Sequence, residues 1–367
     1  MRVSFYNIKA QYDELREPLD RTVHDVISSG NYSLGPNHNA FETEMAALHQ
    51  TKHAIALNSG TDALRIMMDA IGVGPGDEVI SSAFTFVSSA ETIVQTGATP
   101  VFVDIDPVTY NINATQIESA VTSRTKAILP VHLFGQLADV TQITEIAERH
   151  SLHVLEDSAQ AVGSTFNGIP TGNFGIAAGF SFYVTKNLGA AGDAGMIVTN
   201  DDEVAQRCRS IRVHGMGRER YYYDYVGYTA RMDEIQAAVL RVKLTRLAAW
   251  NARRAELAAI YSARLRESGL QLPMTRTGNN NTWHQYTIRT PHRNELQTFL
   301  KESGVDSMIY YPVPLHHHKP YQRFSPGAGV LKEAERACLE VLNLPIHPHL
   351  SNEQVEFVAD RVMAFLG

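Results

Sequence analysis

A chain of 367 residues is long enough to bury a large core and to carry a second, smaller domain. The composition is 44% hydrophobic and 19% charged, and the formal net charge of −7 at pH 7 argues against a nucleic-acid binder, which would carry an excess of basic residues. An acidic chain can still hold a phosphorylated ligand, because backbone N–H groups and one or two local cations are sufficient.

The cysteines and the N-terminal residues indicate the cellular compartment of the protein. Cys208 and Cys338 are far apart and fit no metal or redox spacing, which favours a reducing compartment. Residues 1–6 lead into a charged, helix-patterned stretch rather than an apolar signal region. No window approaches the roughly 20 apolar residues that a membrane helix needs. The sequence therefore predicts a cytoplasmic protein without a membrane segment.

Short β-rich runs alternate with helical patterns between Lys52 and about Asn200. The strand candidates are His53–Leu57, Glu78–Ser82, Pro100–Asp104, Lys126–His132, His153–Asp157, Gly179–Val184 and Met196–Thr199. The helix-like stretches between them include Asp62–Ala70, Ser88–Gln95 and Val140–His150. Apolar strands between helices are typical of a mostly parallel sheet covered on both faces. We therefore predict an α/β fold with a seven-stranded, mostly parallel sheet.

The pattern changes after Arg231. Met232 to about Glu267 is rich in Ala, Leu and Arg and contains no glycine or proline, which predicts one long helix. Beyond it, strand and helix signals mix in Trp283–Arg289, Arg293–Glu302, Asp306–Tyr311, Glu333–Leu342 and Asn352–Phe365. We predict a large domain over residues 1–245 and a smaller α/β domain over residues 246–367. The first ~25 residues are expected to pack on the small domain or on a partner.

The segment Asn58–Asp62 lies between a predicted strand and a predicted helix. Gly60 lets the backbone approach a ligand closely. Thr61 opens a helix whose free N–H groups and macrodipole favour a phosphate. An ordinary helix start with Ser or Thr as N-cap explains the same residues, so this motif alone leaves both interpretations open.

Two charged residues follow predicted strands. Asp157 ends a strand on the side where open parallel sheets bind ligands, and it could cap a helix, bind a metal or pair with a cationic cofactor nitrogen. Lys186 follows the apolar run Gly179–Val184, which is an unusual place for a solvated charge. A lysine there could bond covalently to an aldehyde cofactor, or it could be a structural lysine.

Other motifs are weaker. His316–His318, His347 and His349 have no Cys or acidic partner at ligand spacing, so we predict no metal. The run Gly72–Gly76 contains a proline and lacks the third glycine of a dinucleotide fingerprint, and no GxxxxGK[ST] phosphate loop exists. The tyrosine-rich run Tyr221–Tyr225 is expected to line an interface or a cleft.

The order of these motifs resembles the DegT/DnrJ/EryC1/StrS family of sugar aminotransferases, which has the aspartate-aminotransferase fold type. The resemblance covers nearly the whole chain. It is carried by Gly35-Pro36, Asn58–Leu64, Gly74–Ile80, Phe84–Phe86, Pro130–Gln136, Glu156-Asp157, Ser181-Phe182, Thr185–Gly189, Arg231–Ala238, Tyr311–Leu315 and Leu344–Ile346.

The resemblance implies a pyridoxal-phosphate (PLP) enzyme. It implies that Lys186 holds PLP covalently and moves a proton between the substrate carbon and the cofactor. Asp157 would pair with the pyridine nitrogen and keep it protonated, so that the ring acts as an electron sink. Gln160 would bond the ring oxygen, and Phe86 would stack on the ring face.

The resemblance also indicates which residues would bind the phosphate group of PLP. Gly60, Thr61 and Ser181 would hold it, and a neighbouring subunit would complete the site with Thr229 and Arg231. The implied assembly is a homodimer with shared active sites. Family members often carry Asn at the position of Thr229, which weakens the assignment of that residue.

The residues expected to contact the substrate differ more from the common pattern of the family. Tyr310 stands where His is frequent, in the region where the sugar is expected to bind together with Tyr311 and His316. The segments Trp283–Tyr286 and Tyr311–Pro314 look more like those of 3-keto-sugar aminotransferases than of 4-keto ones. The predicted reaction uses L-glutamate as amino donor and a nucleotide-linked keto-sugar as acceptor, and we favour a dTDP-linked 3-keto-6-deoxyhexose.

Several alternatives differ in how well the residues support them, and Lys186 argues against the dehydratase. UDP-linked 3-keto- or 4-keto-sugars are possible acceptors. A sugar C3-dehydratase on the same fold would carry His in place of Lys186. A non-catalytic regulatory protein on this fold would need neither Lys186 nor Asp157. A dehydrogenase lacks support because the glycine fingerprint is missing.

Overall fold

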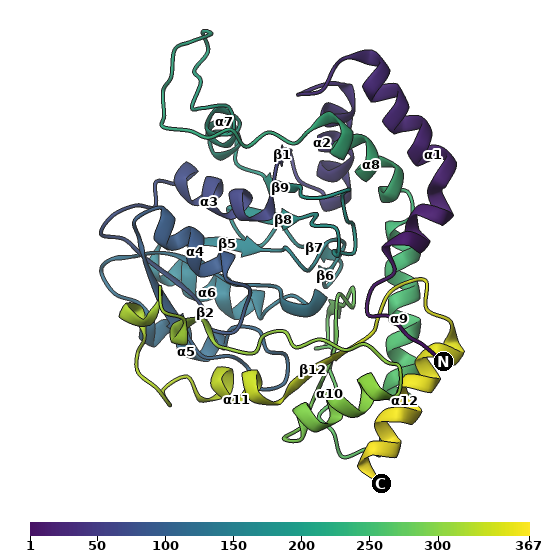
Figure 1. Ribbon diagram of the computed structural model, residues 1–367. Helices are drawn as coiled ribbons and strands as arrows, with labels where there is room; N and C mark the ends of the chain where they lie inside the picture. The colour runs from purple at the N-terminus through teal and green to yellow at the C-terminus, as the bar shows by residue number, and fades with distance from the viewer.

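A seven-stranded sheet lies at the centre of the computed structural model, which describes all 367 residues (Figure 1). The strand order is β1-β9-β8-β5-β4-β2-β3. In chain order the strands are β1 (His53–Leu57), β2 (Glu78–Ser82), β3 (Thr99–Val103), β4 (Thr125–Leu129), β5 (His153–Asp157), β8 (Ala177–Ser181) and β9 (Gly195–Thr199). Strands β3, β2, β4, β5 and β8 are parallel neighbours, whereas β9 is antiparallel to both β1 and β8. The predicted α/β fold with a mostly parallel sheet is confirmed.

Helices cover both faces of this sheet. One face carries α3 (Gly60–Ala70), α4 (Ser88–Gln95) and α7 (Asp202–Ile211). The other carries α2 (Pro36–His49), α5 (Ala114–Ala120), α6 (Val140–His150) and α8 (Glu234–Leu244). Strand β1 shows the two-sided packing, because Ile55 and Leu57 join one hydrophobic cluster while Ala54 and Ala56 join another. Such strands read as continuous apolar runs because both of their faces are buried.

The long helix predicted from Met232 to about Glu267 is wrong. The structure has two helices in its place, α8 and α9 (Leu247–Arg264), with residues 245 and 246 between them. Helix α8 packs against α1 (Ile8–Ser29) and α2, whereas α9 packs against α12 (Asn352–Leu366). The helix is therefore interrupted where the chain passes from the sheet to a second core, beside the predicted domain boundary.

The second core is built around the antiparallel pair β11 (Tyr286–Arg289) and β12 (Val341–Leu344). Helices α9, α10 (Arg293–Glu302) and α12 surround this pair, and α9 and α12 lie side by side at the lower right of Figure 1. The N-terminus reaches both cores. Val3 pairs with Val305 and is buried in the second core, whereas Leu15 and Leu19 of α1 pack with Val239 of α8 and Trp250 of α9.

The remaining elements are short. They are the strands β6 (Thr165–Phe166), β7 (Ile169–Pro170) and β10 (Asn279–Asn280), the 3-10 turns η1 (Leu133–Gly135), η2 (Leu315–His317) and η3 (Gln322–Phe324), and helix α11 (Lys332–Glu340). None of the helices combines the length and the apolar character needed to cross a bilayer.

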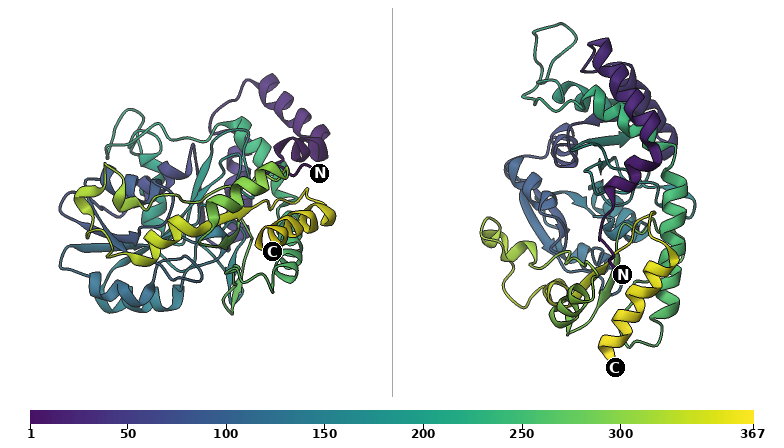
Figure 2. Two further views of the ribbon diagram at one scale, coloured as in Figure 1. Left: turned by 60° about the horizontal axis from the view of Figure 1, so that its bottom comes forward. Right: turned by 45° about the vertical axis from the view of Figure 1, so that its right-hand side comes forward.

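The segment between α7 and α8 extends away from the rest of the molecule in Figure 1 and in the right-hand view of Figure 2. Met216 and Tyr223 form a bridge in it, and the tyrosine-rich run around them is exposed, with Tyr221 at 69%. A Cβ on Gly215 would lie 1.8 Å from the carbonyl oxygen of Tyr225, so only glycine allows the segment to fold back this closely.

Candidate active site

A cavity of about 570 Å³ opens beyond the carboxyl ends of β5 and β8. This is where open parallel sheets bind ligands, and the volume is within the usual range for small-molecule sites. Segments that are far apart in the chain meet here, including the start of α3, the loop before α4 and the stretch Ile309–Pro312. Among the residues predicted from the sequence, the cavity is lined by Gly60, Thr61, Phe86, Asp157, Gln160, Ser181, Lys186, Tyr310 and Tyr311.

Lys186 reaches the cavity from the loop between β8 and β9. Its backbone N–H donates to the Tyr183 carbonyl at 2.8 Å. A Cβ on Gly189 would lie 2.4 Å from the Val184 carbonyl oxygen, so the loop can close only over a glycine. Burial lowers the pKa of Lys186 to about 8, and the nearby charge of Asp157 acts in the opposite direction. The side chain is thus an amine with a substantial neutral, nucleophilic fraction near neutral pH.

Asp157, the last residue of β5, presents a buried carboxylate to the cavity. The Ser89 hydroxyl donates to Oδ2 at 2.9 Å, and the Ala159 amide donates to Oδ1 at 3.2 Å. Burial raises the pKa of Asp157, while these hydrogen bonds and the charge of Lys186 oppose the rise. A buried carboxylate of this kind is stabilised by a cation placed against it. The sequence did not predict Ser89, which is 68 residues away.

Glu156 precedes Asp157 and is completely buried. Successive side chains of a strand point to opposite faces, so Glu156 points away from the cavity. Its carboxylate accepts hydrogen bonds from His132 Nε2 at 2.9 Å and Thr171 Oγ1 at 2.9 Å. The backbone amides of residues 172, 174 and 175 donate to it as well. Burial alone would raise the pKa of Glu156, but these donors hold it below its usual value. Glu156 therefore anchors the chain beneath the site.

The first turn of α3 forms a cradle with two neighbouring hydroxyl groups. The first amides of a helix lack intrahelical partners and favour an anion. Thr61 Oγ1 lies 2.8 Å from Ser88 Oγ, and Ser181 lies against Gly60. A Cβ on Gly60 would be 2.6 Å from Ser181 Cβ, so glycine is needed for this close approach. Ser59 caps the helix by accepting from the Asp62 amide at 3.0 Å. The capping and the phosphate interpretations of this motif are compatible.

Aromatic and amide groups form the opposite wall. Gln160 Nε2 donates to the Tyr311 hydroxyl at 3.0 Å, and Gln160 Oε1 accepts from the Phe134 amide at 2.8 Å. The ring of Phe86 is 54% exposed although it is large and apolar. The Tyr310 hydroxyl lies 2.9 Å from that of Tyr6, which the sequence did not predict as a site residue.

Two predicted residues lie outside this cavity in the chain's own fold. Thr229 is exposed, with Oγ1 3.1 Å from His214 Nε2. Arg231 pairs through its backbone with Leu57, and its guanidinium has no hydrogen-bond or ion-pair partner in the chain.

His316 is also outside the cavity, which its prediction as a substrate contact did not anticipate. It lies in η2, completely buried, with its ring 6.4 Å from that of Phe102 and its Nε2 3.2 Å from Glu335. The chain turns inward after Pro314, so the histidine that follows points into the protein. We do not propose a direct substrate contact for it.

Comparison with known proteins identifies the family. Residues 13–363 match the DegT/DnrJ/EryC1/StrS aminotransferase family. The chain belongs to this family.

Relatives within the DegT/DnrJ/EryC1/StrS family match the full chain. A Geobacillus stearothermophilus protein named pleiotropic regulatory protein is 48% identical over 100% of this chain and 99% of its own length. The dTDP-3-amino-3,4,6-trideoxy-alpha-D-glucose transaminase of Streptomyces venezuelae is 44% identical over 98% of this chain and 95% of its own length. The crystal structure of S. venezuelae DesV in complex with a ketimine intermediate has a TM-score of 0.97 and 43% identity, and covers 100% of this chain and 98% of that one.

The family uses PLP, and the residues of this chain fit that cofactor. The Bacillus subtilis NtdA structure, which is 30% identical with a TM-score of 0.94 over 100% of this chain and 85% of that one, contains bound PMP, the aminated form of PLP. In the present cavity the start of α3 suits a phosphate, Asp157 suits a protonated ring nitrogen, and Lys186 suits an aldehyde carbon. The exposed ring of Phe86 offers an aromatic face for the cofactor ring. The chain is a PLP-dependent aminotransferase.

Proposed function

We propose that this enzyme transfers the amino group of L-glutamate to C3 of a nucleotide-linked keto-sugar, with a dTDP-linked 3-keto-6-deoxyhexose as the acceptor. The observation that carries the proposal is the single cavity that contains Lys186, Asp157 and the start of α3. The high full-length identity to a dTDP-sugar transaminase supports the choice of acceptor. The names of relatives include UDP-linked sugars as well, so a UDP-linked 3-keto- or 4-keto-sugar is the alternative.

Lys186 would bond the cofactor at rest and act as the proton carrier once the donor displaces it. When bound, PLP withdraws electrons from the substrate carbon that loses its proton. The Lys186 amine, with its pKa lowered to about 8, can accept that proton and return it to the neighbouring atom. General acid–base catalysis by one positioned group contributes roughly 10²- to 10⁴-fold.

The other residues of the cavity would bind and orient. Asp157, fixed by Ser89, would keep the ring nitrogen protonated. Gln160 would bond the ring oxygen, and Phe86 would cover one ring face. Gly60, Thr61 and Ser181 would hold the phosphate through backbone amides and hydroxyl groups.

The acceptor sugar would bind against Tyr310 and Tyr311. Tyr310 is held by Tyr6, and Tyr311 by Gln160, so both phenol groups have fixed positions before the sugar arrives. Pre-organised hydroxyls of this kind orient a polar ligand at low entropic cost. Because Tyr310 stands where the family often has His, this wall is also where we expect the choice among keto-sugars to be made.

We also propose a homodimer in which each subunit supplies Thr229 and Arg231 to its neighbour's phosphate. The unpaired guanidinium of Arg231 supports this arrangement. A phosphate dianion at the start of α3 would gain a charge-assisted hydrogen bond from it.

A regulatory role is the second candidate, because a relative with 48% identity is named a pleiotropic regulatory protein. The complete set of Lys186, Asp157 and Ser181 in one cavity favours the enzyme. A protein that only bound a partner would have no need of a lysine with a lowered pKa beside a buried carboxylate.

The first test is the visible absorption spectrum of the purified protein with PLP, before and after L-glutamate. We expect a band from lysine-bound cofactor that glutamate bleaches, and that a dTDP-linked 3-keto-sugar restores with formation of the amino sugar. UDP-linked and 4-keto-sugars test the alternatives in the same assay. Lys186→Ala should fold normally, as judged by circular dichroism, and lose steady-state turnover. Retained turnover in this variant, or no band in folded wild-type protein, would refute the proposal.

A further inference from the structure

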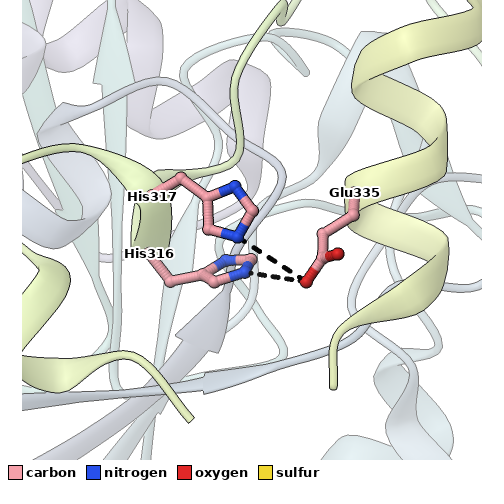
Figure 3. A group of neighbouring side chains, drawn as sticks. All are labelled: His316, His317 and Glu335. Atoms are coloured by element: carbon pink, nitrogen blue, oxygen red, sulfur yellow. Dashed lines mark hydrogen bonds and ion pairs between the residues drawn. The ribbon is translucent and has the colours of Figure 1, made fainter. Parts of the chain in front are cut away.

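A cluster of two histidines and a glutamate lies outside the active-site cavity, where η2 meets α11 (Figure 3). His316 and His317 both direct Nε2 toward the same carboxylate oxygen, Oε1 of Glu335. The sequence argument against a metal was that these histidines have no acidic partner at ligand spacing. Folding supplies that partner from α11, where Glu335 is 19 residues after His316.

The separations of the donor atoms match a metal coordination sphere. Zn²⁺ binds imidazole nitrogen and carboxylate oxygen at about 2.0–2.2 Å in a tetrahedron, which places neighbouring ligand atoms about 3.3–3.5 Å apart. In this structure Glu335 Oε1 is 3.2 Å from His316 Nε2 and 3.7 Å from His317 Nε2. One ligand atom from each of the three residues lies within 4.8 Å of the others.

A simple hydrogen bond does not explain the whole arrangement. His316 lies within hydrogen-bond distance of Glu335, and that pair alone would account for a buried histidine beside an acid. His317 is too far from Glu335 for a hydrogen bond, and yet its Nε2 faces the same oxygen at 3.7 Å. Two imidazole nitrogens that converge on one carboxylate oxygen are better explained by a shared cation.

The surroundings fix the ligands in place. The Gly329 amide donates to both carboxylate oxygens of Glu335, at 2.9 and 3.1 Å, as expected for a ligating carboxylate with an outer hydrogen bond. His316 is completely buried, whereas the side chain of His317 is 37% exposed. Solvent can therefore reach one side of the cluster, where an ion could enter and a water molecule could complete the coordination.

We propose that His316, His317 and Glu335 bind a divalent transition-metal ion such as Zn²⁺, which two-histidine, one-carboxylate ligand sets hold in other proteins. The ion would join η2 to α11. The chain just before η2 contributes Tyr310–Pro312 to the active-site cavity, and the Leu315 amide is bonded to the Ala83 carbonyl at 2.8 Å. A metal here would therefore be structural, and would hold in place the segment that bears the cavity's tyrosines. It is independent of the proposed choice of substrate.

The test is calorimetric titration of ZnCl₂ into PLP-loaded protein that has been freed of metal by a chelator. We expect one Zn²⁺ per chain, with affinity lowered at least about tenfold in His317→Gln and in Glu335→Gln. His318→Ala is the matched control, because its side chain is an exposed neighbour outside the cluster, and it should bind as wild type does.

If Glu335→Gln folds poorly, His317→Gln alone decides the test. Its fold should be unaffected, because the His317 side chain is partly exposed and makes no hydrogen bond within the cluster. Circular dichroism and the melting temperature of each variant check the fold. The proposal is overturned if wild-type protein takes up no Zn²⁺, if His317→Gln binds it as tightly as wild type, or if His318→Ala weakens it equally.

Discussion

The lowered pKa of Lys186 makes a quantitative prediction about cofactor loading. Only a neutral amine attacks the aldehyde of PLP. With a pKa of about 8, roughly one molecule in ten carries neutral Lys186 at pH 7. A lysine with its ordinary pKa would be neutral in about one molecule in 3,000, so burial should accelerate loading about 300-fold at pH 7.

The assay is the growth of the visible cofactor band after PLP is mixed with apo-protein at a series of pH values. We expect the rate to rise nearly tenfold from pH 6 to pH 7, to reach half its maximum near pH 8 and to level off above that pH. The reaction of PLP with Nα-acetyl-lysine in the same buffers corrects for ionisation of PLP itself. A rate that continues to climb until about pH 10, as for an ordinary lysine, would show that the reasoning about burial is wrong.

Asp157→Asn tests the second influence on this pKa. The charge of Asp157 raises the pKa of Lys186 and so opposes the effect of burial. Without that charge the pKa should be lower still, and the rate should level off at a lower pH than in wild-type protein. A midpoint at or above the wild-type value would contradict this assignment, whatever the variant does to cofactor affinity.

Three further predictions concern binding, stability and assembly. Gly60→Ala would place a methyl group 2.6 Å from Ser181 Cβ, and an overpacking cost of about 1–3 kcal/mol should raise the dissociation constant of PLP about 5- to 150-fold in equilibrium dialysis. Gly74→Ala, whose Cβ has nothing nearer than 3.9 Å, should leave PLP affinity unchanged, and equal weakening there would remove the steric explanation. Glu156→Gln leaves several buried donors facing an amide, so urea unfolding should show a loss of about 3–5 kcal/mol that the exposed control Glu145→Gln does not show. Mixing inactive Lys186→Ala with inactive Arg231→Ala should restore about a quarter of wild-type activity through heterodimers with one intact site, and no recovery would count against shared sites.

The central sheet could be predicted well from the sequence because its signals are local. The bounds of β1, β2 and β5 agree with the predicted runs, as do those of α4 and α6. In each case a short apolar run or a helical period is bounded by turn residues, and the buried face of each element follows from that pattern.

The break between α8 and α9 could not be predicted in the same way. Residues 232–267 contain no glycine or proline, so their intrinsic preference is for a continuous helix. The interruption arises because α8 packs on α1 and α2 while α9 packs on α12, and one straight helix cannot serve both cores. Tertiary packing overrides local preference here.

The candidate site also contains some residues with a local sequence signal and others that only the fold brings together. Asp157 ends a recognisable strand and Lys186 comes shortly after another, so their positions in the chain were sufficient to single them out. The groups that hold them did not have such a signal. Ser89 reaches Asp157 across 68 residues, and Tyr6 reaches Tyr310 across 304, so only the folded chain brings these pairs together. Glu335 reaches His316 in the same way, although each residue alone has an ordinary sequence environment.

The adjacent carboxylates at the end of β5 make the length of the chain before them critical. One added residue that shifted this strand would put Glu156 where Asp157 now faces the cavity, whereas one deleted residue would put Asp157 where Glu156 now faces His132. A shift by two residues would return each acid to its original face of the sheet. It would nevertheless move both acids about 6.6 Å along the sheet, away from Lys186. Substitutions in the loop between α6 and β5 should therefore be tolerated far better than insertions, because the pairing of Ala127 with His153 sets the strand register that directs Asp157 into the cavity.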